Sequence, residues 1–372
     1  MKWSWKLATV AGIEVKMHAT FLLIVAWIGF SYYLTGGTLT AALLGIAFLL
    51  ALFLCVVLHE FGHALTARRF GIQTRDITLL PIGGVARLER MPDKPMQELW
   101  VALAGPAVNL VIAALFFLGL ALTTGAPSLT ATSLTGGPFL ERLMFVNIFL
   151  VVFNMIPAFP MDGGRVVRAL LATRLEYTQA TQIAATLGQG IAFIFGLVGL
   201  FTNPFLVFIA LFVYIGAAQE ASMAQMRGAL SGIPVSRAML TDFRSLYEGD
   251  PLSKAVELIM SGAQTEFPVL SANGQVVGVL TRKSLVDALQ RLGQNAPVSG
   301  AMDCKYQSVD SNDMLEEVSR KMQTQDCHTL PVVHHGELVG LITMENIGEF
   351  MMIRSALKKS GGNVNRFINS LE

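Results

Sequence analysis

The sequence predicts a multi-span α-helical membrane protein with a soluble α/β domain towards its C-terminal end. Of its 372 residues, 53% are hydrophobic and only 14% are charged, which is too apolar for an ordinary soluble protein. The long apolar runs lie in residues 1–222, whereas residues 233–353 have the composition of a soluble α/β domain and repeat internally. We therefore expect a membrane domain over 1–226, a linker at 227–232, the repeated domain at 233–353 and a tail at 354–372.

Six apolar segments are expected to be transmembrane helices, because each approaches the length that a helix needs to cross the hydrocarbon core. These spans are expected at residues 17–34, 40–69, 99–122, from 143 into a broken segment at 154–164, 183–201 and 204–218. Residues 70–95 are too polar to cross. Within them, two short β-like runs around Pro81 and the pair Gly83-Gly84 predict a membrane-associated β-hairpin over 77–88.

Basic residues set the expected orientation, since cytoplasmic loops retain Lys and Arg. An N-terminus inside the cell places the Arg-rich segment 68–95 and Arg227 on the cytoplasmic side, and leaves Arg142 near the outside. Both termini are therefore expected in the cytoplasm. The net charge of +1 gives no reason to expect a nucleic-acid partner, and the three cysteines form no Cys-x-x-Cys pair.

The second expected span ends in the pattern His-Glu-x-x-His, formed by His59, Glu60 and His63. On a helix, two histidines four residues apart project from one face and can bind a single Zn²⁺, with Glu60 beside them. Ionisable side chains inside a membrane helix are costly, and by default they mark a functional site. The pattern therefore predicts the metal site of a zinc hydrolase within the membrane.

A catalytic zinc usually has three protein ligands and keeps one position for water. Asp162 is the other ionisable side chain expected at a comparable depth, in a segment where two prolines and the pair Gly163-Gly164 prevent a regular helix. Irregular backbone is tolerated inside a bilayer only where it is buried in protein or lines water. We expect Asp162 to be the third ligand; the alternative is an interfacial aspartate that caps the next helix.

These motifs together resemble those of the site-2 protease family of intramembrane zinc metalloproteases. The resemblance rests on H-E-F-G-H at residues 59–63, on N-x-x-P-x-x-P-x-D-G at 154–163 and on A-G-P-A-x-N at 104–109. It covers residues 1–222. By this resemblance we expect an enzyme whose substrate is a membrane-spanning segment.

The resemblance also implies roles for single residues. His59, His63 and Asp162 are expected to hold one zinc ion, and Glu60 is expected to be the catalytic carboxylate, which takes a proton from water and passes it to the leaving amine. His18 opens the first expected span and is interpreted as an interfacial histidine with no special role; the alternative is an inhibitory ligand that reaches the metal.

Two further features are expected to serve the same site. Asn154 and Asn109 are buried amides on other segments, which can donate to the oxyanion or clamp the substrate backbone; the alternative is interhelical hydrogen bonds that hold spans together. Thr78, Leu79 and Leu80 of the hairpin are expected to form an exposed edge strand, to which an extended substrate can add.

The C-terminal part repeats itself with a period of about 63 residues. The pattern P-V-S-R-A-M at Pro234 recurs as P-V-S-G-A-M at Pro297, which predicts two β-α-β-β-α units over about 233–292 and 296–353. This duplication resembles a tandem pair of CBS domains, so the membrane domain resembles the CBS-bearing branch of the protease family. In many proteins such a pair binds adenine nucleotides between its repeats.

The nucleotide residues of the CBS family are matched only in part. The family has a Thr after the second strand and an Asp three residues later; the second repeat has Thr343 and Asn346, and the first has Thr281 and Ser284. Ser284 lacks the carboxylate that would bind a ribose diol. We expect an adenine nucleotide to bind weakly through the second repeat, with a purely dimerising role as the alternative and a homodimer expected by analogy.

The sequence therefore predicts a zinc endopeptidase of the prokaryotic plasma membrane that cleaves membrane-tethered regulatory proteins and is regulated by its CBS pair. Two alternatives stay open. A CBS-gated transporter should line a path with further intramembrane charges, of which the spans offer almost none beyond the four residues of the motif site. A catalytically silent membrane receptor is the other alternative, and the intact Glu60 argues against it.

Overall fold

A computed structural model describes residues 3–81, 83–92, 94–123, 138–262, 264–304, 306–325 and 327–359. The chain divides into two compact units, Met1–Gln225 and Met226–Glu372. The expected loop between the third and fourth spans falls at 124–137, outside the described residues, as do the last residues of the expected tail, 360–372.

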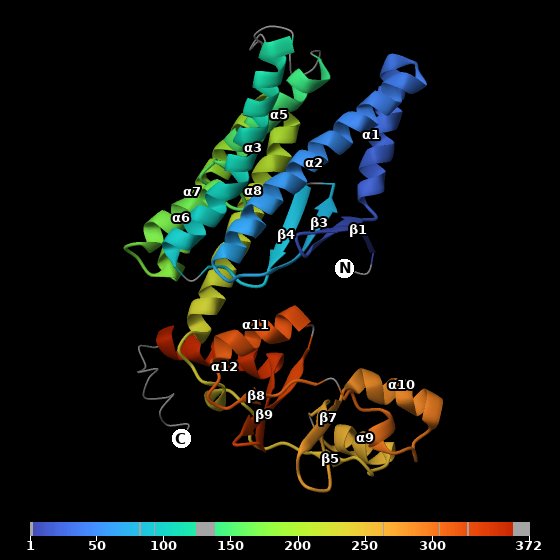
Figure 1. Cartoon of the computed structure of the whole chain (residues 1–372). Coiled ribbons are helices and arrows are strands. Elements are labelled where there is room, and N and C mark those ends of the chain that lie inside the picture. The colour runs from blue at the N-terminus through green and yellow to red at the C-terminus, as the bar shows by residue number, and fades with distance from the viewer. Residues whose placement is uncertain are drawn as a thin grey trace. The chain divides into compact units, whose positions relative to one another are not determined.

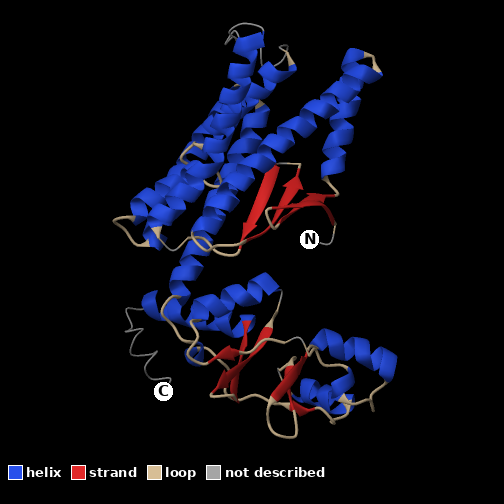
Figure 2. Cartoon of the chain, viewed as in Figure 1, coloured by secondary structure: helices blue, strands red, loops and turns tan. Residues whose placement is uncertain are grey.

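The first unit is a helical bundle with a small β-sheet beside one of its helices (Figures 1 and 2). Its elements are β1 (Ser4–Val10), β2 (Ile13–His18), α1 (Phe21–Gly36), α2 (Leu39–Arg69), β3 (Thr74–Leu80), β4 (Gly83–Leu88), α3 (Pro95–Thr123), α5 (Phe139–Asn154), α6 (Asp162–Ala172), α7 (Tyr177–Phe201) and most of α8 (Pro204–Leu230).

Four of the described helices, α2, α3, α7 and α8, are long and apolar enough to cross a membrane. Helices α1 and α5 have 16 residues each. At 1.5 Å per residue such a helix is about 24 Å long, short of the ~30 Å hydrocarbon core. The structure thus has the helices of a membrane domain, and the count of six spans stays a prediction.

The sheet has four strands in the order β1-β2-β3-β4. Strands β3 and β4 form an antiparallel pair, and β2 joins the other side of β3 in parallel. The expectation that Thr78, Leu79 and Leu80 form a free edge is therefore wrong for Thr78 and Leu79, because β2 pairs with β3 at these two residues. Met17 and His18 end β2 rather than opening a span, since apolar and polar side chains alternate from Ile13 onwards as they do in a strand.

The sheet packs one face against α2. Ile13, Val15 and Ile77 form a buried cluster with α2, and a second cluster joins Leu79 to the same helix and to Phe21 of α1. This packing fixes the β3–β4 turn beside the part of α2 that carries the histidines.

The second unit holds the two repeats, each with one three-stranded sheet, ordered β5-β6-β7 and β10-β9-β8. Its elements are the end of α8, two 3₁₀ turns at Val235–Arg237 and Val298–Gly300, β5 (Leu246–Tyr247), α9 (Leu252–Ser261), β6 (Phe267–Leu270), β7 (Val276–Leu280), α10 (Arg282–Leu292), β8 (Val309–Asp310), α11 (Leu315–Gln325), β9 (Thr329–His334), β10 (Glu337–Thr343) and α12 (Met344–Lys359).

The repeats exchange their leading segments. Val235 lies before the first repeat's sheet but is buried in the core of the second repeat, and Val298 lies before the second sheet but is buried in the core of the first. The end of α8 joins the same arrangement, because Leu230 is buried in the core of the second repeat. Residues 227–230, expected in a linker, are therefore the end of a helix.

Candidate metal centre and active site

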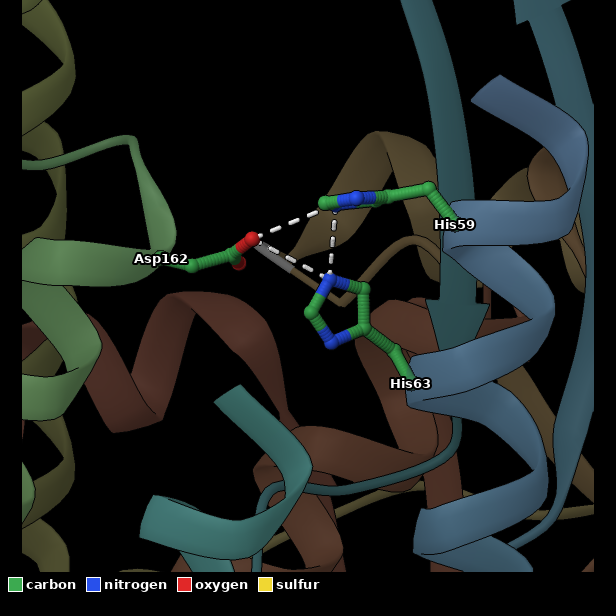
Figure 3. Close-up of side chains that lie close together, drawn as sticks. All are labelled: His59, His63 and Asp162. Carbon is green, nitrogen blue, oxygen red and sulfur yellow. Dashed lines mark hydrogen bonds and ion pairs between the residues drawn. The ribbon is translucent and has the colours of Figure 1, made fainter. Parts of the chain in front are cut away.

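Three ionisable side chains from two helices converge in the first unit (Figure 3). His59 and His63 lie one turn apart on α2, and Asp162 is the first residue of α6. The two Nε2 atoms are 3.0 Å apart, and Asp162 Oδ2 lies 3.2 Å from Nε2 of His59 and 3.1 Å from Nε2 of His63. All three residues are buried, with 4–6% of their surface exposed.

The hydrogen bonding of His63 indicates the protonation of its ring next to the other two potential metal ligands. Its Nδ1 lies 2.7 Å from the carbonyl oxygen of Val101, which can only accept, so Nδ1 carries the proton. In the neutral ring, Nε2 then has a free lone pair, which faces a carboxylate oxygen of Asp162 and a nitrogen of His59. Electron-rich atoms at this spacing repel one another unless a proton or a metal ion lies between them, and a carbonyl that orients a ligating histidine is usual at metal sites.

Zinc matches this donor set. Ligands held ~2.0–2.2 Å from a tetrahedral ion lie roughly 3.3–3.5 Å from one another. The observed separations of 3.0–3.2 Å are a few tenths of an ångström shorter, so a small outward movement admits the ion. Two imidazoles and one carboxylate leave a fourth position for water or substrate.

A glycine on α3 makes room for the histidines. A Cβ atom added at Gly105 would lie 2.6 Å from Nε2 of His59 and closer still to Nε2 of His63. On the facing helix, a Cβ atom added at Gly62 would lie 2.7 Å from the carbonyl oxygen of Ala104. The two glycines let α2 and α3 approach closely enough for Val101 to orient His63.

Asp162 is held in place by a charge cluster farther along α6. Arg168 is 1% exposed; its Nε donates to Glu98 Oε1 at 2.7 Å and its Nη1 to Glu220 Oε2 at 2.9 Å. Its guanidinium carbon lies 4.9 Å from the ring centroid of Phe159 and 5.0 Å from that of Tyr177. The cluster therefore fixes α6 between α3, which carries Glu98, and α8, which carries Glu220.

A cavity of about 400 Å³ lies beside the donor triangle. His59 and Glu60 line it from α2, Asn109 from α3 and Asn154 from α5. The rest of its lining is mainly apolar: Ile24, Leu49, Leu52, Phe53, Val56, Pro81, Gly83, Gly84, Leu150 and Phe153. Asn109 is fully buried, and neither of its amide atoms has a hydrogen-bond partner among the described residues. Such an amide is free to bind a ligand.

The structure brings most of the expected active-site residues together. The expected substrate-binding residues of β3 lie outside the cavity. His59, Glu60, Asn109 and Asn154 share the cavity, whereas Thr78 is buried within the sheet. The sheet residues that do line the cavity belong to the turn and to β4. A Cβ atom added at Gly84 would lie 2.9 Å from Cγ of Glu60, so this end of β4 passes directly beside the glutamate.

Comparison with known proteins agrees with this geometry. The model of Peptidase family M50 matches residues 47–137 and 131–197, and the CBS domain model matches 230–291 and 298–352. A zinc metalloprotease of Methanocaldococcus jannaschii is 31% identical over 355 residues, which cover 95% of this chain and 97% of that protein. This chain belongs to peptidase family M50. The resemblance to CBS-bearing site-2 proteases is thereby confirmed.

Two further comparisons also find similar proteins. The site-2 protease from M. jannaschii, a solved structure, is 37% identical and covers 59% of this chain and 95% of that one, with a TM-score of 0.44. Stage IV sporulation protein FB of Bacillus subtilis is 29% identical over 136 residues, which cover 36% of this chain and 44% of that protein.

In the second unit, the residues expected to bind nucleotide act as helix caps. Thr281 Oγ1 accepts a hydrogen bond from Ser284 N at the start of α10, and Thr343 Oγ1 accepts one from Asn346 N at the start of α12, each at 3.1 Å. Thr343 also donates to Oδ1 of Asn346 at 2.5 Å. The two repeats thus use the same cap at equivalent positions, as their duplication implies.

Proposed function

We propose that this M50 peptidase is an intramembrane zinc endopeptidase that cuts the membrane-spanning segments of other proteins. The observation that carries this proposal is the meeting of His59, His63 and Asp162 beside a largely apolar cavity, on helices whose composition suits a bilayer. A relative that is named a zinc metalloprotease and is similar over nearly its whole length supports it.

His59, His63 and Asp162 fit a zinc ion, and when bound it would supply Lewis acidity that activates water and polarises the peptide carbonyl. Glu60 lines the cavity next to His59, where it can accept a proton from the attacking water. The water oxygen bonds to the carbonyl carbon, the C–N bond breaks, and Glu60 returns the proton to the amine nitrogen. The products are a carboxylate and a new amino terminus.

Asn109 and Asn154 support the reaction in this proposal by donating hydrogen bonds to the oxyanion that develops on the substrate carbonyl. Both line the cavity, Asn109 from α3 and Asn154 from α5, and the amide of Asn109 lacks a partner among the described residues. A buried amide that donates where negative charge develops stabilises the transition state more than the ground state. Substitution of Asn109 by Ala should therefore lower kcat more than it raises KM.

The substrate is proposed to add as a strand to β4 rather than to β3. Among the described residues, β4 pairs with β3 alone, so its other edge is free for hydrogen bonding. Gly84 places that strand beside Glu60. The N–H group of either Val85 or Ala86 faces the free edge of β4. Substitution of that residue by proline should impair cleavage without loss of zinc. Full activity in both variants would contradict strand addition.

The decisive experiment compares the wild-type chain with Glu60→Gln on a purified transmembrane test substrate. Gln keeps the shape of Glu60 but cannot take up the proton, so cleavage should fall by orders of magnitude while one zinc ion per chain stays bound. Cleavage by Glu60→Gln at the wild-type rate would refute this role. Loss of zinc would instead assign Glu60 to the metal site.

We also propose where the enzyme lies and how it is regulated. We place the enzyme in a prokaryotic plasma membrane with both termini in the cytoplasm and membrane-tethered regulatory proteins as substrates. Its CBS pair would bind an adenine nucleotide at Thr343 and Asn346 and form a homodimer. Calorimetry on the full chain should then detect ATP or AMP binding, and Asn346→Ala should weaken it; no heat with either nucleotide leaves the dimerising role.

A further inference from the structure

We propose that the outer strand of the sheet, β1, is a lipid-binding surface that lies at the boundary between headgroups and acyl chains. The surface consists of Trp5, Ala8 and Val10, hereafter the β1 apolar face. Strand β1 ends the sheet, and six of its seven residues are exposed. Trp5 is 53% exposed and Val10 is 50% exposed, which is unusual for large apolar side chains that share one face of a sheet.

The strand register shows which way this face points. Trp5 pairs with Met17, and Ala8 pairs with Val15 beyond a bulge in β1. Directly paired residues lie on the same side of a sheet. Met17 and Val15 pack against α2. The β1 apolar face therefore continues the surface that covers a membrane helix, but extends past that helix and is left uncovered.

The opposite side of the sheet is charged. Lys6 Nζ lies 2.8 Å from Glu14, Lys16 bridges Glu14 and Asp76, and Arg87 Nη2 lies 2.6 Å from Asp76. Hydrogen bonds from Lys16 and, to a smaller extent, Lys6 lower the pKa of Glu14 to about 2, so this carboxylate stays ionised. The side chains of Lys6, Glu14 and Arg87 are 52%, 37% and 40% exposed, which suits water on that side. An apolar other side is the division expected of an element lying at a membrane surface.

Two hydrogen bonds fix the height of β1 relative to the helices. Ala19 N donates to the carbonyl oxygen of Trp3, which ties the start of β1 to the start of α1, where Leu23 is 70% exposed. Arg68 Nη1 donates to the carbonyl oxygen of Ala11, which ties the β1–β2 turn to the basic end of α2. Strand β1 thus spans the zone between a lipid-facing apolar turn and the last basic turn of a spanning helix.

This zone is where tryptophan is most stable in a membrane protein. Trp carries an apolar ring and one N–H group, and it is enriched at the level of the headgroups. The chain has four tryptophans, and two of them, Trp3 and Trp5, lie at β1 with more than half of their surface exposed. A bilayer is the partner whose chemistry matches a tryptophan-bearing apolar strand that continues the lipid-facing surface of the helices.

Fluorescence quenching tests the proposal at two neighbouring positions. One full-length variant keeps Trp5 as its single tryptophan, with Phe at Trp3, Trp27 and Trp100; the control has Phe at all four positions and carries Lys6→Trp. Both are reconstituted in phosphatidylcholine vesicles, with and without bromine atoms on the upper acyl carbons. Iodide in the buffer reports exposure to water.

Trp5 should emit at a shorter wavelength than the control, lose fluorescence to brominated lipid and resist iodide, whereas the tryptophan at position 6 should show the reverse. Quenching of Trp5 by iodide and not by brominated lipid overturns the proposal. Protection of Trp5 from both quenchers also overturns it, and shows that a second protein chain covers the strand. If the replaced chains fail to retain zinc, the wild-type chain and Trp5→Phe are compared, and Trp5→Phe should lose part of the quenching by brominated lipid.

Discussion

Gly105 sets how closely α3 can approach the two histidines. Because an added Cβ atom would overlap Nε2 of both rings, Gly105→Ala must push His59 and His63 apart or displace α3. We expect the variant to lose most of its zinc and, with it, most of its proteolytic activity. Zinc analysis of the purified protein measures the effect.

Gly119 provides the matched control on the same helix, because a Cβ atom added there meets nothing within 4 Å. Gly119→Ala should retain zinc and activity, and should be slightly more stable because alanine favours a helix by about 1 kcal/mol over glycine. Equal zinc content in the two variants would show that the close approach of α3 is not needed.

At the scale of single residues, the sequence predicts which side chains form the site better than it predicts the contacts that position them. His59, Glu60 and His63 form a pattern on one helix, and Asp162 stands out as a charge within an irregular apolar segment. The orientation of His63 depends on a main-chain carbonyl, that of Val101, which every residue has and no pattern marks. Gly105 belongs to a motif that the sequence shows. A glycine is needed there because the histidines of another helix leave no room for a side chain, which the sequence does not show.

Helix α6 is positioned by Arg168, and breaking this cluster should move Asp162. Removing one partner of a buried ion pair typically costs about 3–5 kcal/mol, because the remaining charge is left without compensation. We expect Arg168→Gln to lower both the unfolding temperature and the zinc affinity, measured by competition with a chelator. Arg174→Gln, at an exposed position just after α6, should change neither. Unaltered zinc affinity in Arg168→Gln would separate the cluster from the metal site.

The sheet should lose stability in acid through Asp76. Burial alone would raise the pKa of Asp76, but hydrogen bonds from Arg87 and Lys16 outweigh it and hold the pKa below its ordinary value. A lowered pKa stabilises the fold above the unfolded value of about 3.9, and the gain is lost as the pH falls through the folded value. The unfolding temperatures of the wild-type chain and Asp76→Asn should therefore differ at pH 6 and converge towards pH 3 or below, roughly. A difference that grows in acid would contradict this sign.

Elements were predictable where their signal is local. The long helices follow from uninterrupted apolar runs, and the break before α6 follows from Pro and Gly. The sequence alone places the end of strand β2 in the first span, because the alternation of β2 is short and merges with the apolar run of α1. Strand β3 was expected at an edge because its second neighbour, β2, lies about 60 residues away in the sequence; Lys16, on β2, pairs with Thr78.

The whole chain should respond to metal removal in one unit only. Zinc bound to the folded state alone stabilises it by about 4 kcal/mol when free zinc is 1,000 times Kd. Calorimetry in detergent should show two transitions, and a chelator should lower the temperature of the one that belongs to Met1–Gln225, leaving that of Met226–Glu372 in place. A chelator that shifts both transitions equally would show that the units unfold together.

The duplication of the second unit was readable from the sequence, but its packing was not. Sequence repeats mark where a segment was copied, whereas Val235 and Val298 are each buried in the core of the other repeat. The exchange of leading segments depends on contacts between the two repeats, so the length of the sequence repeat does not reveal it. The same applies to residues 227–230, which belong to the expected linker at 227–232 yet end a helix.

The central claim is that two imidazoles and one carboxylate bind a single zinc ion. X-ray absorption at the zinc edge of the purified full-length chain tests it directly. We expect one zinc per chain, with two imidazole nitrogens and further oxygen donors ~2.0–2.2 Å from the metal, and loss of that signal in Asp162→Ala. A sulfur neighbour at ~2.3 Å, or a spectrum unchanged in Asp162→Ala, would contradict the account.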